Sequence, residues 1–237
     1  MSDGPEVIVV HVPKTGGSTF GHFLQSLYGK ENFEHDLRRV PAAVPLHGDF
    51  TDLKRQVEAE VEGRTSWPKV VMGHFPLWKY EQFRRSAFTI VWLREPAARL
   101  LSQYFSARER RSAQRRAAGA AWVRAFPPER IMEVEWPSNP VTGWFLRGYD
   151  LDDLDFVGIQ EHFAEDVAEL GRMLGWPEVE IPAHNQTTTP EYLGFHPSEE
   201  LLRKIRAANQ ADVELYERAL ELRRARVSTG VRQSART

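Results

Sequence analysis

Residues 11–19, HVPKTGGST, combine the side-chain types that bind anions. A lysine carries positive charge, two glycines let backbone N–H groups approach a ligand closely, and three hydroxyls can donate hydrogen bonds. The loop follows an apolar run and precedes a helical pattern, so the dipole of that helix would also attract an anion. The alternative is an ordinary strand–helix turn with a solvated lysine. The anion-binding candidates are Lys14, Thr15, Gly16, Gly17, Ser18 and Thr19.

The order of these residues differs from that of the Walker nucleotide-binding loop, G-x-x-x-x-G-K-[ST]. Lys14 precedes both glycines, and no Gly-Lys-Ser/Thr follows it. In the Walker loop the last hydroxyl holds Mg²⁺, and this sequence shows neither that hydroxyl nor an apolar strand ending in a suitable aspartate. The pattern therefore predicts an anion site without a metal. An ATP-dependent kinase or NTPase with an unusual loop, and a nucleotide-binding module without turnover, remain alternatives.

Two further residues follow apolar runs and could complete a site. His74 comes after the run at 70–72, and an imidazole with a pKa near ~6.5 can accept a proton at neutral pH. Arg94 comes after the run at 88–93, and its guanidinium fork suits a phosphate monoester. Among the other histidines, His47 is the second candidate for a base, and we expect His11 to brace the loop.

The spacing of apolar residues predicts the elements that position these side chains. Runs of mainly apolar residues are typical of buried parallel strands, and they predict strands at residues 7–10, 69–72, 88–93 and 156–159. Helical spacing occupies residues 20–28, 52–62, 161–174 and 199–226 and a stretch that starts near Pro96. This alternation predicts a three-layer α/β fold with a mainly parallel sheet flanked by helices. We expect one domain over residues 1–226 and a flexible tail over 227–237.

Two segments resemble the nucleotide-binding elements of sulfotransferases that use 3′-phosphoadenosine 5′-phosphosulfate (PAPS): HVPKTGGST at 11–19 and FTIVWLREPAARLLSQYF at 88–105. The similarity is to carbohydrate O-sulfotransferases, in particular the group that contains the heparan sulfate 2-O enzymes. Weaker similarities are VMGHF at 71–75, NPVTGWFLRG at 139–148, FVGIQEHF at 156–163 and ELYERAL at 214–220. The sequence departs from the family pattern at Ser18–Thr19, where many relatives have Thr-Ser, and at Glu95, where Asp is usual.

The resemblance implies a P-loop-like fold and transfer of a sulfuryl group from PAPS to an acceptor hydroxyl without a metal, with 3′,5′-adenosine bisphosphate as the product. It implies that the loop, from Lys14 to Thr19, holds the 5′-phosphosulfate, and that Arg94 and Ser102 hold the 3′-phosphate. Lys14 would also stabilise the leaving phosphate, and His74 would be the catalytic base. We expect Arg99 to have a structural role, paired with Glu95 at i, i+4.

Composition restricts the partners and the compartment. The 237 residues are 41% hydrophobic with a net charge of −2, which gives no general attraction to nucleic acid or to anionic membranes. The absence of cysteine excludes disulfides and thiolate metal sites. No apolar run approaches the ~20 residues of a membrane span, so we expect a cytoplasmic protein. The acceptor would be a carbohydrate or a small metabolite. The Arg-rich segment 108–124 could attract an acidic acceptor or form a charged helix face, and the oligomeric state stays open.

Overall fold

The computed structural model describes residues 4–36, 51–109, 126–133, 138–177 and 190–234. The strands are β1 (Val7–Val10), β2 (Phe33–Asp36), β3 (Val70–Gly73), β4 (Phe88–Leu93) and β5 (Phe156–Ile159). The α-helices are α1 (Gly17–Tyr28), α2 (Thr51–Glu62), α3 (Pro96–Glu109), α5 (Phe163–Leu174), α6 (Pro190–Leu193), α7 (Glu199–Ala208) and α8 (Gln210–Ser234). Two shorter helical segments matter below, η2 (Leu77–Phe83) and η5 (Val141–Phe145).

The five strands form one sheet in the order β2-β3-β1-β4-β5, and every pairing is parallel. The central strand β1 pairs with β3 on one side and β4 on the other, so that Val10 lies opposite both Gly73 and Val91. The chain therefore turns to opposite sides of β1, which makes its carboxyl end the topological switch point where α/β sheets bind ligands. The loop at 11–16 starts there.

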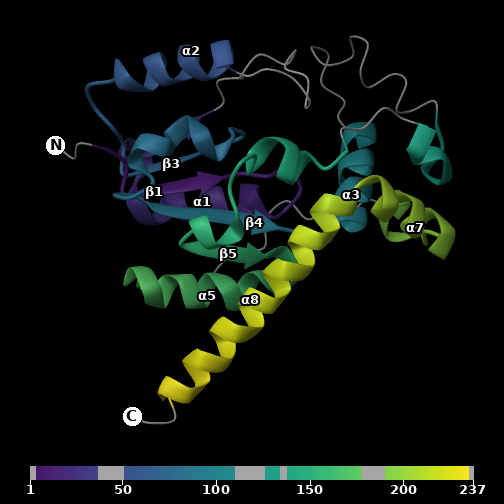
Figure 1. Cartoon of the computed structure of the whole chain (residues 1–237). Helices are drawn as coiled ribbons and strands as arrows, with labels where there is room; N and C mark the ends of the chain where they lie inside the picture. Colours follow the sequence, from purple (N-terminus) through teal and green to yellow (C-terminus); the bar gives the residue numbers. More distant parts are fainter. Residues whose placement is uncertain (1–3, 37–50, 110–125, 134–137, 178–189, 235–237) are drawn as a thin grey trace.

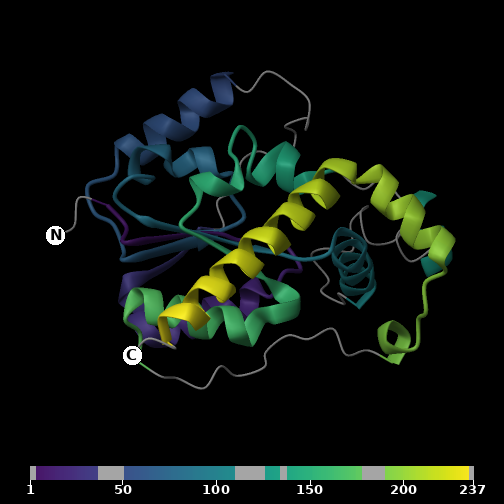
Figure 2. The same cartoon turned by 60° about the horizontal axis from the view of Figure 1, so that its bottom comes forward.

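Alternate residues of the strands face two separate apolar cores. On one face Ile8, Val10 and Val91 pack with η2, η5 and α8. On the other face Val9 and Trp92 pack with α1 and α5. Figures 1 and 2 show the resulting layers, with the sheet between α1 and α5 on one side and α2 and η2 on the other. The predicted three-layer α/β fold with a parallel sheet is confirmed.

A third apolar cluster lies beyond the carboxyl end of β4. It joins α3 to α6 and α7 and includes the buried Leu101, Phe105, Ile131 and Ile205. In Figure 1 this group stands beside the sheet, and α8 runs from it diagonally across β5 toward α5. The helix α8 thus ties the α3 end of the molecule to the sheet.

Two features of the fold differ from the sequence prediction. Strand β2 was not predicted, because it is a polar edge strand, FEHD, that buries only Asp36. The helix expected over 199–226 is two helices, because the backbone at Asn209 leaves helical geometry. The Asn209 side chain is held by two hydrogen bonds. Its NH₂ group donates to the Ile205 carbonyl, and its oxygen accepts from the N–H of Asn139. The second of these helices ends at Ser234 instead of at residue 226.

Within the described ranges, no helix combines the length and the apolar character needed to cross a bilayer.

Candidate functional site

The loop after β1 has an unusual backbone. Lys14 has φ 71° and Gly16 has φ 85°, so both adopt the left-handed conformation. For lysine this conformation costs on the order of 1 kcal/mol or more and persists only where the surroundings hold it. The Thr15 hydroxyl donates to the Val12 carbonyl at 2.8 Å and is fully buried. Thr15 therefore braces the loop. Because its hydroxyl is used in this bond, its backbone N–H is the group that could bind an anion.

The loop leads directly into the N-terminus of α1. Gly16 occupies the cap position without a side-chain cap, and the first turn contains no acidic residue. A helix leaves its first N–H groups without intrahelical acceptors, and its dipole places partial positive charge there. Ser18 is exposed in this turn, whereas Thr19 is buried. The sequence prediction of an anion-attracting helix start at this loop agrees with this geometry.

Gly17 leaves room for a buried imidazole. A Cβ atom at position 17 would lie 2.0 Å from Cδ2 and 2.1 Å from Nε2 of His11, far inside contact distance. The His11 side chain is 7% exposed, and its ring centroid lies 4.3 Å from that of His74. His11 thus packs between the start of α1 and His74, which is the bracing role expected for it.

His74 emerges at the carboxyl end of β3, next to the start of the loop. It is exposed, and its Nδ1 lies 2.6 Å from the His11 carbonyl oxygen. A carbonyl only accepts, so Nδ1 carries the proton of this bond, and Nε2 of the neutral ring then keeps its lone pair. The backbone of the loop therefore orients the His74 ring and makes Nε2 its basic nitrogen.

The neighbouring imidazoles are held neutral. Burial, and to a lesser extent the nearby His74 and His35, lower the pKa of His11 to about 3. The pKa of His35 is also lowered, first by burial and then by His74 and His22, while Asp36 acts in the opposite direction. At neutral pH the surroundings of His74 therefore contain uncharged rings.

A buried ion pair fixes the segment that follows His74. Asp36, at the end of β2, accepts from Lys79 Nζ at 2.6 Å and from the Tyr80 hydroxyl at 2.8 Å. Lys79 and Asp36 are 5% and 3% exposed, so a buried ion pair connects η2 to the edge strand of the sheet. The pKa of Tyr80 is raised by burial and by the Asp36 carboxylate. Sequence reasoning missed this network, since nothing in a polar edge strand marks one acid as buried.

Arg94, at the end of β4, reaches the loop directly. Its Nη1 donates to the Lys14 carbonyl at 3.2 Å, and its Nη2 donates to the Tyr192 hydroxyl at 3.3 Å. Its Nε is buried and finds no acceptor in the described part of the chain. Arg94 thus supports the left-handed backbone of Lys14 and keeps one donor unused. Tyr192, from α6, was not among the predicted residues.

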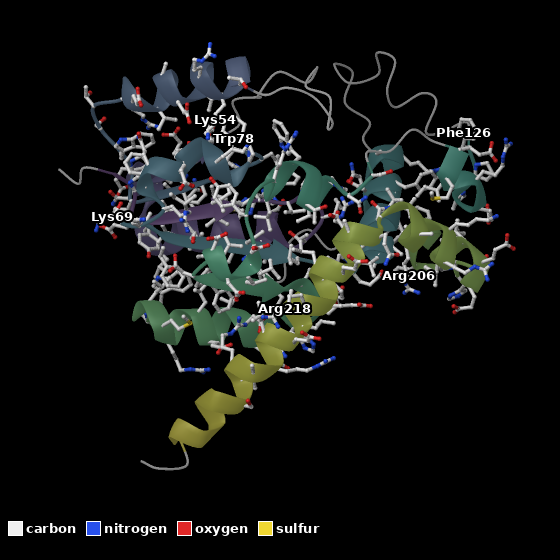
Figure 3. The ribbon with its side chains drawn as sticks, viewed as in Figure 1. Lys54, Lys69, Trp78, Phe126, Arg206 and Arg218 are labelled. Atoms are coloured by element: carbon white, nitrogen blue, oxygen red, sulfur yellow. The ribbon has the colours of Figure 1, made fainter. Side chains whose placement is uncertain are left out.

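The start of α3 corrects one expectation. The Glu95 carboxylate accepts from the Ala98 N–H at 2.7 Å, which caps α3, and from Arg206 Nε at 3.0 Å. Arg206 belongs to α7, where Figure 3 labels it. The expected Glu95–Arg99 pair is therefore wrong: the acid binds the Ala98 N–H and Arg206, and Arg99 is buried and donates to Gln103. Ser102, also expected at the site, is buried one turn after Arg99.

Other candidates are placed elsewhere or not at all. His47 and residues 110–124 of the Arg-rich segment lie outside the described residues. Arg108, the first arginine of that segment, donates to the Tyr104 hydroxyl at 2.8 Å and to the Phe126 carbonyl at 3.0 Å, so it ties α3 to the segment at 126 (Figure 3). Among the residues with described positions, no group of three or more His, Asp or Glu side chains could hold a metal ion.

Comparison with known proteins identifies the family of this chain. The model of the sulfotransferase family matches residues 1–218. A search of curated proteins finds no match. Because the family match extends over most of the chain, the protein belongs to the sulfotransferase family.

Proposed function

We propose that this protein is an O-sulfotransferase that takes its sulfuryl group from PAPS. The observation that carries the proposal is the contact between Arg94 and the Lys14 carbonyl. It joins two cationic residues that, by resemblance, serve opposite ends of one donor, the 5′-phosphosulfate and the 3′-phosphate.

The residues present fit such a donor. The uncapped N-terminus of α1 and the left-handed loop offer backbone N–H groups to the 5′ end. Lys14, Gly16, Gly17, Ser18 and Thr19 would hold that end, with Thr15 contributing through its backbone. The buried, unsatisfied Nε of Arg94 is suited to the 3′-phosphate, together with the Ser102 hydroxyl.

The chemistry follows from the roles of two side chains. In an in-line transfer, the acceptor oxygen forms a bond to sulfur while the bond from sulfur to the bridging phosphate oxygen breaks. The Lys14 ammonium would stabilise the negative charge that develops on the departing phosphate oxygen. His74 would take the proton of the acceptor hydroxyl on Nε2, because its Nδ1 is bound to the His11 carbonyl.

The donor and acceptor complete the proposal. The acceptor is a hydroxyl group of a carbohydrate or of a small metabolite, as in the carbohydrate O-sulfotransferases that the sequence resembles. We further propose that the reaction is independent of metal ions and takes place in the cytoplasm.

The first experiment is calorimetric titration with 3′,5′-adenosine bisphosphate, beside ATP with and without Mg²⁺. We expect the bisphosphate to bind without Mg²⁺ and both Lys14→Ala and Arg94→Ala to weaken its binding. Preference for Mg²⁺-ATP would overturn the proposal in favour of a kinase or NTPase.

The second experiment separates catalysis from binding. Transfer of labelled sulfate from PAPS to a panel of sugars and metabolites should fall by about 10²–10⁴ in His74→Gln, while its affinity for the bisphosphate stays as in the wild type. His196→Gln, which changes another exposed histidine, is the matched control. If His74→Gln keeps full turnover on an accepted substrate, His74 is not the base.

A further inference from the structure

A second arginine lies buried beside the predicted 3′-phosphate residues. Arg99, in α3, is 4% exposed. Its Nη1 donates to the neutral side chain of Gln103 at 3.2 Å, and its Nε is buried without an acceptor in the described part of the chain. A guanidinium stays protonated in proteins, and burying it without a counter-charge costs several kcal/mol. The fold therefore maintains a positive charge here at a cost in stability.

No nearby acid forms a direct ion pair with Arg99 within the described ranges. Asp212 acts on it electrostatically, but both Asp212 oxygens accept bonds from the residues at 141 and 142, namely two backbone N–H groups and the Thr142 hydroxyl. The Glu95 carboxylate binds Arg206. Over the described ranges, neither Arg94 nor Arg99 has an ion pair with a carboxylate. Burial lowers the pKa of Arg99, the Asp212 charge raises it, and the Arg94 charge lowers it.

The position of Arg99 links the two residues already expected to bind the 3′-phosphate. Arg99 and Ser102 are three residues apart on α3 and thus share a helix face. Arg94 stands just before the same helix, close enough for its charge to act on Arg99. Two adjacent guanidiniums repel each other, and a phosphate monoester with nearly two negative charges would balance both.

We propose that Arg99 supplies the second positive charge of the 3′-phosphate subsite, behind Arg94 and beside Ser102. This inference rests on the proposed function, because it assigns a residue to the donor site of that reaction. It makes Arg99 a specificity residue: the protein would distinguish ligands with a 3′-phosphate from ligands without one through a pair of arginines.

The test compares 3′,5′-adenosine bisphosphate with adenosine 5′-monophosphate, which lacks the 3′-phosphate. In Arg99→Gln we expect affinity for the bisphosphate to fall about 10- to 100-fold, the range for a lost charge-assisted hydrogen bond. Affinity for the monophosphate should change less than about threefold. Arg99→Lys, which keeps the charge but loses the planar fork, should give an intermediate loss. Arg130→Gln removes one exposed arginine elsewhere and is the control for net charge.

Thermal unfolding of the ligand-free protein provides a second readout. Since the cost of burying the Arg99 charge outweighs its attraction to Asp212, the melting temperature of Arg99→Gln should equal or exceed that of the wild type. A strongly lowered melting temperature, or equal weakening of both nucleotides, would show that Arg99 is structural and would overturn the inference. Unchanged discrimination in Arg99→Gln would overturn it as well. If the wild-type protein itself does not prefer the bisphosphate over the monophosphate, the proposed function fails instead.

Discussion

Replacing Gly17 by alanine tests whether the imidazole of His11 shapes the anion-binding loop. The new Cβ would lie 2.0 Å from His11 Cδ2, whereas ordinary contacts begin near 3.4 Å. The ring would have to withdraw by more than 1 Å, yet it is buried and lies against His74. Either the ring or the first turn of α1 must therefore move.

The expected cost follows from overpacking a rigid site. Inserting a methyl group into a packed interior costs about 1–3 kcal/mol, and the better helix propensity of alanine returns less than about 1 kcal/mol. We expect Gly17→Ala to lose about 1–2 kcal/mol of unfolding free energy, measured by urea denaturation. Because the N–H groups of the first turn would be displaced, affinity for 3′,5′-adenosine bisphosphate should fall at least about tenfold.

A double-mutant cycle identifies the cause. In Gly17→Ala/His11→Ala the added methyl group enters the space vacated by the ring, so the double variant should be more stable than the sum of the single changes predicts, by about 1 kcal/mol. Gly21→Ala is the matched control in the same helix, because its Cβ would meet the end of the flexible Met72 side chain at 3.2 Å and Phe33 Cζ at 3.8 Å. Full stability of Gly17→Ala together with strict additivity would refute the steric reasoning.

Three further changes should affect stability, measured by urea denaturation for the first and third and by limited proteolysis for the second. Asp36→Asn leaves the buried Lys79 ammonium without its counter-charge and should cost about 3–5 kcal/mol; a loss below 1 kcal/mol would mean that water reaches this lysine. Asp166→Asn breaks the pair with Arg223 (2.7 Å) that fastens α8 to α5, so proteases should cut α8 sooner, and an unchanged cleavage rate would contradict this. The lowered pKa of His11 means that below pH 6.5 the unfolded chain binds a proton that the folded chain excludes. Stability should thus fall by about 1 kcal/mol per pH unit from pH 6.5 toward 3, and His11→Gln should lack this part of the slope; equal slopes would refute the assignment.

The features that were predicted correctly from the sequence are those that leave a local pattern of residues. The runs at β1 and β4 are apolar and β-branched because parallel strands are buried on both faces, so they stand out in a single sequence. The residues that follow such strands, Lys14, His74 and Arg94, reach the same edge because parallel strands end together. Strand β2 escaped detection because an edge strand with polar side chains has no such pattern.

The contacts that organise the site could not be predicted in this way. His11 was expected to brace the loop, but its exact fit against Gly17 depends on the approach of α1 to β1. Tyr192 lies 98 positions after Arg94 and meets it only through the packing of α6 on α3. The Glu95–Arg99 pair was expected because acids and bases four residues apart often pair on exposed helix faces, but Arg99 is buried.

The parallel sheet has a consequence for how the chain is made. Strand β1 lies at the centre of the sheet and is synthesised before all the strands it pairs with, since its partners β3 and β4 come much later in the chain. At about 5–20 residues per second, synthesis from Val10 to Val70 takes roughly 3–12 s. During that interval the segment VIVV has no strand to pair with, and β5 appears only after residue 156. The nascent chain should therefore depend on chaperones that cover apolar segments, and variants that weaken the core should lower the yield of folded protein before they affect catalysis.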